Sequence, residues 1–419
     1  MLHQVQVEPV PIDTYRVVAG DAICDRLIAL ADQLRGLRVL QVNATPYGGG
    51  VSELLRSSVA IMRGLGLDVS WQVISGDSAF FEVTKGIHNG LQGGAYQLTP
   101  ATEEQYLLNS TRNAQLLDEH FDIIVIHDPQ PAAIAQLHNQ DDALWIWRCH
   151  IDTAQANPKV AAFLIPFLKA YDAAIFTMAD FVLPSLSTPI VRLIPPGIDP
   201  LSPKNLDLPT SVIRSTVEWM GVDPDRPLMI QVSRFDPWKD PLGVVRIYRL
   251  LRASYPALQL ALLGSMALDD PEGWRLYERI LAETRDDPGV LVATNLTGVS
   301  NIEVNAFQRH ASLAIQKSLR EGFGLVVSET LWKGTPVVAG AAGGIRLQMP
   351  AGTGGFLVDS YDEQAFVERI GLLLEQPDER QRLGDSGHAI VQEHFLITRM
   401  VADELELWLE LNGKRCRDG

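Results

Sequence analysis

LRVLQVNA (37–44), VSELLRSSVAIMRGLG (51–66) and VSWQVIS (69–75) are consecutive segments of this chain, and together they decide its fold. The first and last are short apolar runs, as expected for buried strands, whereas the middle one repeats its apolar residues at helical spacing. A strand, a helix and a second strand in this order form a unit whose two strands lie parallel in one sheet. The sequence therefore predicts an α/β fold with a doubly wound parallel sheet.

The same alternation continues along the chain and is interrupted once. Further strands of a first sheet are predicted at 122–127, 144–149, 173–177 and 191–194. The segment PPGIDPLSPKNLDLPT (195–210) has five prolines and no clear periodicity, so we interpret it as a linker. A second sheet is predicted at 228–233, 258–263, 290–293, 312–316, 336–339 and 355–358, followed by two or three helices over 362–411. A length of 419 residues suits two domains, and we place two Rossmann-like domains at 1–200 and 201–395.

Composition narrows the class of protein. A net charge of −16 argues against a nucleic-acid binder, which needs a basic face for phosphate contacts. Three widely spaced cysteines, Cys24, Cys149 and Cys416, form neither a disulfide framework nor a metal-binding pattern. The chain has neither a signal-peptide pattern nor an apolar run long enough to span a membrane. We therefore expect a cytoplasmic protein that contacts no membrane.

Polar residues follow the predicted strands of the first half. In open parallel sheets ligands bind beyond the carboxyl ends of the strands. The residues at such positions are Asn43, Tyr47, Gly49, Gly50, His127, Asp128, Arg148, His150 and Asp152. The glycines do not match a GxGxxG fingerprint, and a single histidine at a strand end is more often structural. Two histidines on neighbouring strand ends favour a site.

The second half has a cationic loop and a pair of glutamates. Arg234 and Lys239 follow one predicted strand and could hold a diphosphate. In SLREGFGLVVSETLWKGT (318–335), Glu321 precedes a glycine-flanked turn and Glu329 lies inside a helix predicted from Leu325 to Lys333. Such a helix start attracts anions, so the segment suits a ligand with hydroxyls and phosphate. Solvated glutamates and an exposed turn are the alternative, while HExxH, GxSxG and GxxxxGK[ST] motifs are absent.

Taken together, these residues resemble a retaining glycosyltransferase of family 4 with the GT-B fold. The resemblance spans nearly the whole chain. Within the family, the chain most specifically resembles the trehalose glycosyltransferring synthases. It rests on NATPYGGGVSE (43–53), FFEVTKGIHNGLQGG (80–94), HDPQP (127–131), WRCHID (147–152), SRFDPWKDP (233–241) and the glutamate segment.

The resemblance implies reversible transfer of glucose between a nucleoside diphosphate and glucose, which gives α,α-trehalose with retained configuration. Its implied catalytic residues are His150, Arg234, Lys239 and Glu321. Its implied donor-binding residues are Gly49, Gly50, Gly322, Phe323, Gly324, Leu325 and Glu329, and its implied acceptor-binding residues are Asp128, Asp152 and Tyr47. It also implies a cleft between the domains and a last helix, within 396–419, that returns to the first domain.

The expected partners are NDP-glucose, the NDP, glucose and trehalose. No metal or other cofactor is expected to be required, with Mg²⁺ at most a stimulant. A trehalose phosphorylase, a transferase to another sugar and a noncatalytic sugar- or nucleotide-binding protein remain alternatives. Arg346 follows Gly343-Gly344-Ile345, at a position where the resemblance implies a less polar residue. The preference for a donor base or an acceptor near this loop is therefore open. The nucleotide base, the physiological direction and the oligomeric state, for example a homodimer, are also open.

Overall fold

The structure is a computed structural model that describes residues 2–138, 142–266 and 271–418. It divides into two compact units. Unit 1 is Met1–Gly197 together with Ile397–Gly419, and unit 2 is Ile198–Leu396. The chain therefore passes from one unit to the other twice.

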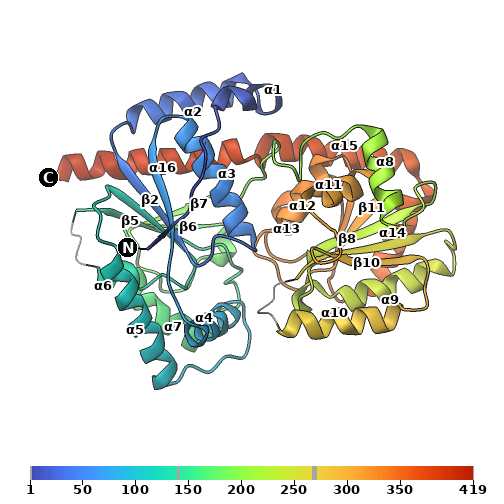
Figure 1. Cartoon of the computed structure of the whole chain (residues 1–419), viewed down its shortest axis with the longest axis horizontal. Helices are drawn as coiled ribbons and strands as arrows, with labels where there is room; N and C mark the ends of the chain where they lie inside the picture. Colours follow the sequence, from blue (N-terminus) through green and yellow to red (C-terminus); the bar gives the residue numbers. More distant parts are fainter. Residues whose placement is uncertain (1, 139–141, 267–270, 419) are drawn as a thin grey trace. The chain divides into compact units, whose positions relative to one another are not determined.

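Unit 1 is built on a seven-stranded sheet in the order β1-β3-β2-β4-β5-β6-β7. Figure 1 labels β2, β5, β6 and β7 of this sheet. Its strands are β1 (His3–Gln4), β2 (Arg38–Asn43), β3 (Asp68–Val73), β4 (Ile123–His127), β5 (Leu144–Arg148), β6 (Ala173–Phe176) and β7 (Ile190–Leu193). All pairs are parallel except β1 with β3. Its helices are α1 (Arg16–Ala19), α2 (Asp21–Gln33), α3 (Gly50–Gly64), α4 (Ser78–Leu91), α5 (Pro100–Leu116), α6 (Ile134–Leu137), α7 (Pro158–Leu168) and α16 (Ile397–Asp418).

Unit 2 has a six-stranded parallel sheet in the order β10-β9-β8-β11-β12-β13. Figure 1 labels β8, β10 and β11 of this sheet. Its strands are β8 (Leu228–Arg234), β9 (Gln259–Ser265), β10 (Val290–Thr294), β11 (Leu313–Gln316), β12 (Val337–Gly340) and β13 (Gly355–Val358). Its helices are α8 (Thr210–Trp219), η3 (Pro237–Lys239), α9 (Pro241–Arg252), α10 (Pro271–Thr284), α11 (Asn301–His310), α12 (Leu325–Trp332), α13 (Ile345–Gln348), α14 (Glu363–Glu375) and α15 (Pro377–His394).

The central strands are buried on both faces, which explains why they read as continuous apolar runs. Every residue of β4 and β5 is buried. In unit 1 large side chains such as Phe80, Tyr106 and Trp147 fill the core between sheet and helices. Tyr248 and Phe366 do the same in unit 2.

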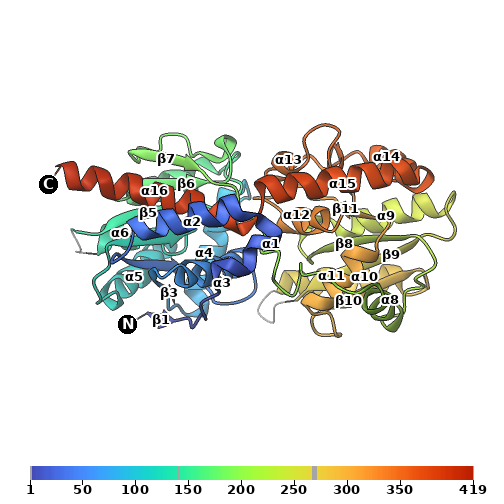
Figure 2. The same ribbon diagram turned by 90° about the horizontal axis from the view of Figure 1, so that it is seen from above.

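The last helix, α16, packs beside α2 although most of the chain separates them in sequence (Figure 1 and Figure 2). Glu404 of α16 forms a buried ion pair with Arg148 at the end of β5. Arg26 of α2 donates to Glu406 at 2.6 Å. Breaking a buried ion pair typically costs about 3–5 kcal/mol, so the Arg148–Glu404 pair ties the end of the chain to the first sheet.

The α/β fold with two parallel-sheet domains is confirmed. The short edge strand β1 was not predicted, because two residues carry no periodicity. The last helix begins at Ile397 and ends at Asp418, inside the range 396–419 expected for it. Within the described residues, no helix combines the length and apolar character that crossing a membrane requires.

Candidate functional site

In unit 2, the loops after β8 and β11 meet at the carboxyl edge of the sheet. The two strands are neighbours, and the Leu319 amide donates to the Trp238 carbonyl at 2.7 Å. This brings Lys239, on the η3 turn, against Glu321. Lys239 Nζ donates to Glu321 Oε2 at 2.5 Å, and Ser318 Oγ donates to the same oxygen at 3.2 Å. Glu321 Oε2 therefore accepts from two side chains of the same unit.

An ion pair between a buried lysine and a partly exposed aspartate holds the turn that carries Lys239. Asp240 has a left-handed backbone (φ 42°), which is uncommon for a residue with a side chain. Its carboxylate accepts from Gly243 N at 3.0 Å, which caps α9, and pairs with Lys317, whose side chain is 2% exposed. The Lys317 ammonium also donates to the Ser360 carbonyl at 3.0 Å. These contacts fix the residue next to Lys239, and sequence analysis missed both Asp240 and Lys317.

The turn after Glu321 leads directly into α12. Gly324 adopts φ 84°, a left-handed conformation that favours glycine, and α12 begins at Leu325. The first N–H groups of a helix have no partner inside the helix and attract anions. Gln348 supports this turn, because its Nε2 donates to the Phe323 carbonyl at 2.6 Å and its Oε1 accepts from Ser328 at 2.6 Å.

Arg234 and Glu329 differ in their exposure. The Arg234 side chain is 58% exposed and lies 3.3 Å from Asp236, so it is available to an anion. Glu329 is 3% exposed, and its Oε1 lies 3.5 Å from Lys204 Nζ. Its Oε2 is buried without a hydrogen-bond partner among the described residues. A buried acceptor of this kind calls for a donor.

Lys333 also belongs to the surroundings of Glu329. Its Nζ donates to the Glu329 carbonyl and to Asn205 Oδ1, both at 2.8 Å. Burial lowers the pKa of Lys333 to about 7, against the opposing effect of the Glu329 charge. Lys204 and Lys333 were not predicted, since the residues come from the linker and from the end of α12.

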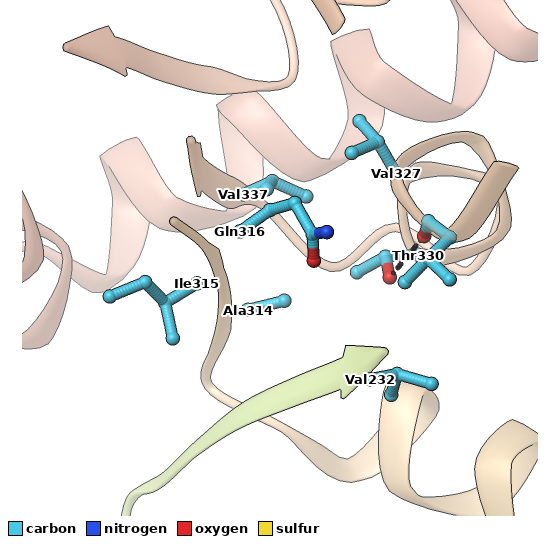
Figure 3. Close-up of a pocket in the computed structure, with 8 residues that line it drawn as sticks. Val232, Ala314, Ile315, Gln316, Val327, Thr330 and Val337 are labelled. Carbon is cyan, nitrogen blue, oxygen red and sulfur yellow. Dashed lines mark hydrogen bonds between the residues drawn. The ribbon is translucent and has the colours of Figure 1, made fainter. Parts of the chain in front are cut away.

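A small cavity in unit 2 lies between β8, β11, β12 and α12 (Figure 3). Its lining includes the polar side chains of Gln316 and Thr330 and the apolar side chains of Val232, Val327 and Val337. Its volume of about 10 Å³ is close to the room needed by one water molecule. It is too small for a sugar or a nucleotide.

In unit 1, the neighbouring strands β4 and β5 end side by side and bring His127, Asp128 and His150 together. His127 Nδ1 lies 2.9 Å from His150 Nε2, and His127 Nε2 lies 2.7 Å from Gln41 Oε1. His150 N donates to Asp128 Oδ1 at 2.8 Å. His127 is buried and His150 is partly exposed. Gln41, a buried residue of β2, was not predicted.

Asp128 is a buried carboxyl group in a strained position. Its φ is 65°, and its side chain is held by His150 N while its carbonyl accepts from Trp147 Nε1 at 3.0 Å. Burial raises the pKa of Asp128 to about 7, partly offset by the hydrogen bond from His150 and the charge of Arg148. Asp152 is also buried and accepts from Ala154 N at 3.0 Å.

Arg148 is the last residue of β5, and its contacts are structural. Its side chain is 3% exposed and pairs with Glu404 on α16. Burial lowers the pKa of Arg148 to about 9, with the Arg399 charge as the next cause. A position at a strand end could not show that this arginine has a structural role, because His150 and Asp152, the neighbouring site candidates, occupy similar positions.

The loop between β2 and α3 is open. Gly48 has φ 79°, and a side chain at Gly49 would meet no atom within 4 Å. Gly50 begins α3, and Tyr47 is 73% exposed. The loop is held from within, because Asn43 Nδ2 and Ser52 Oγ both donate to the Thr45 carbonyl, at 2.7 and 2.8 Å.

Two family models match the chain. Residues 41–183 match "Trehalose synthase, N-terminal domain", and residues 218–389 match "Glycosyl transferases group 1". The trehalose synthase of Rubrobacter xylanophilus is 44% identical, covering 99% of this chain and 100% of the relative. That of Thermococcus litoralis is 43% identical over 96% of each. A trehalose phosphorylase of Pleurotus pulmonarius is 29% identical, covering 86% of this chain and 55% of the phosphorylase.

Solved structures share the fold. A sucrose-phosphate synthase from Thermosynechococcus elongatus matches with a TM-score of 0.73 and 18% identity, over 90% of this chain and 100% of the other. A trehalose-6-phosphate synthase studied for glycosyl transfer with retention matches at 0.72 and 13% identity, over 88% and 99%. At these identities the likeness shows a GT-B fold.

Proposed function

Because the chain belongs to the trehalose synthase family and is a hexosyltransferase of the group 1 type, we propose that it moves glucose reversibly between a nucleoside diphosphate and glucose to form α,α-trehalose. The configuration at the transferred carbon is retained. Unit 2 binds the NDP-glucose donor, and unit 1 supplies the groups that bind the sugar acceptor. We expect the enzyme to work in the cytoplasm.

The observation that carries this proposal is the grouping at the carboxyl edge of the unit 2 sheet. Lys239, Glu321 and the start of α12 lie together there, and Arg234 is the last residue of β8, the strand that leads to Lys239. A cationic group and a helix start suit a diphosphate, while a carboxylate suits sugar hydroxyls. Glu329 has a buried acceptor that a ribose hydroxyl would satisfy.

The proposed mechanism follows from the place where negative charge develops during glucose transfer. Departure of the NDP places negative charge on its outer phosphate, and Lys239, Arg234 and the first amides of α12 stabilise that charge more in the transition state than in the ground state. In unit 1, Gly49 and Gly50 are also proposed as donor-binding residues. In this scheme the departing phosphate helps to remove the proton from the acceptor hydroxyl. The positive side chains of Lys239 and Arg234 offset the negative charge of the phosphate, so this scheme requires no metal.

In unit 1, Asp128, Asp152 and Tyr47 are the groups proposed for the acceptor. Buried carboxylates bind hydroxyls strongly, because charged hydrogen bonds are shorter and stronger than neutral ones. His150 is proposed to contact the donor sugar. Its partial exposure supports this role.

A trehalose phosphorylase is the second candidate, since one relative of that activity is 29% identical. Phosphate would then replace the nucleotide as the attacking group. The buried Glu329 favours the synthase, because inorganic phosphate offers no ribose hydroxyl for it.

The test is to incubate trehalose with UDP, ADP, GDP or inorganic phosphate, with or without EDTA, and to follow the products by chromatography. Glucose plus an NDP-glucose would establish the synthase and its base. Glucose 1-phosphate formed with phosphate alone would establish the phosphorylase. Loss of activity in EDTA would contradict the metal-free scheme, and no reaction under any condition would contradict both candidates.

A further inference from the structure

The row Gln41, His127 and His150 crosses the carboxyl edge of the unit 1 sheet from β2 through β4 to the end of β5. The His127 and His150 rings are within 15° of parallel, and their centroids are 5.2 Å apart. The two joined nitrogens are much closer, at 2.9 Å, so the rings meet edge to edge through a hydrogen bond.

The direction of the protons along this row follows from its first member. Gln41 Oε1 can only accept, so the proton in the 2.7 Å contact is on His127 Nε2. A neutral imidazole carries one proton, which leaves His127 Nδ1 as an acceptor. The proton in the 2.9 Å contact therefore belongs to His150 Nε2.

Both rings are held neutral by their surroundings. Burial lowers the pKa of His127 and His150 well below the usual value, and the positive charge of Arg148 adds to this. A neutral His150 with its proton on Nε2 has Nδ1 as its acceptor.

We propose that Gln41 and His127 are positioning residues that hold His150 in the Nε2–H tautomer, so that Nδ1 of His150 accepts a hydrogen bond from a hydroxyl of the transferred sugar. This rests on the proposed function, in which His150 contacts the donor sugar. The tautomer itself does not depend on that function.

The deciding variant is Gln41→Glu, which keeps the shape of the side chain. A carboxylate accepts from His127 Nε2 as the amide does, but its charge favours a second proton, on His127 Nδ1. That proton would be donated to His150 Nε2, so the proton of His150 would move to Nδ1. His150 would then present a donor where an acceptor is required.

The tautomers are read by ¹⁵N NMR of the imidazole nitrogens in histidine-labelled protein. His138, whose Nδ1 contacts the Ala114 carbonyl in the same unit, is an internal reference that should not change. Gln33→Glu places the same charge on an exposed part of α2 and is the matched control. His127→Gln is the conservative variant, because its amide can accept from His150 and donate to Gln41.

We expect Nε2–H for His150 in the native protein and in His127→Gln, and Nδ1–H in Gln41→Glu. Turnover of trehalose with its preferred NDP should fall about tenfold in Gln41→Glu, the value of one lost hydrogen bond, and stay near native in His127→Gln and Gln33→Glu. Nδ1–H in the native protein would overturn the proposal. So would a changed tautomer with unchanged turnover. A native protein with the expected tautomer but no activity would refute the proposed function alone.

Discussion

Replacing Asp128 by asparagine should stabilise unit 1. Burial raises the pKa of this carboxyl from 3.8 to about 7, so the folded state favours the neutral form. Each pKa unit corresponds to about 1.36 kcal/mol, so keeping Asp128 ionised in the fold costs about 4 kcal/mol. Asparagine removes that cost, still accepts from His150 N, and tolerates the left-handed backbone.

The sign of the pH dependence follows from the raised pKa. Below pH 3.8 the carboxyl is neutral in both states, so the asparagine variant gains nothing there. As the pH rises from 3.8 to about 7 the native protein loses stability relative to the variant, and above that window the difference is constant. We expect a gain of about 2 kcal/mol at pH 5 and about 4 kcal/mol at pH 8.

The assay is a urea titration read by hydrogen–deuterium exchange, with the peptides of β4 and β5 reporting on unit 1. Asp118→Asn, at an exposed position of the same unit, is the control and should change stability by less than about 0.5 kcal/mol. A variant no more stable than the native protein at pH 8, or a gain independent of pH, would refute the reasoning.

Further predictions concern the site. Lys239→Met should lower turnover by about 10²–10³-fold with an unchanged circular dichroism spectrum, because it removes a charge at the leaving group; near-native turnover would contradict that role. Lys317→Met should destabilise unit 2 by about 1–3 kcal/mol in urea, because it removes the buried ammonium that pairs with Asp240 and donates to the Ser360 carbonyl. Adding Asp240→Gly should recover most of this loss, since glycine suits φ 42°, and no recovery would show that the pair is not the cause. If the Asp128 carboxylate binds the acceptor, kcat/KM for trehalose should rise with pH up to about 7, and a flat profile would exclude that role.

The sequence predicted those features that depend on order along the chain. Apolar runs located the strands, and strand ends located Lys239, Glu321 and His150. Contacts between distant segments were not predictable, because periodicity says which face is buried but not what it meets. The pairing of Lys317 with Asp240, the support of the Glu321 turn by Gln348 and the burial of Glu329 beside Lys204 are of this kind.

The return of α16 to unit 1 has a consequence for the order in which the protein is made. Unit 2, Ile198–Leu396, is continuous in the chain and can fold as soon as it has left the ribosome. Unit 1 needs Glu404 to neutralise the buried Arg148, and Glu404 is made only after the whole of unit 2. At about 5–20 residues per second, its first part waits roughly 10–50 s for this partner. The domain encoded first is therefore completed last, and a truncated chain would leave that domain with an unpaired buried charge.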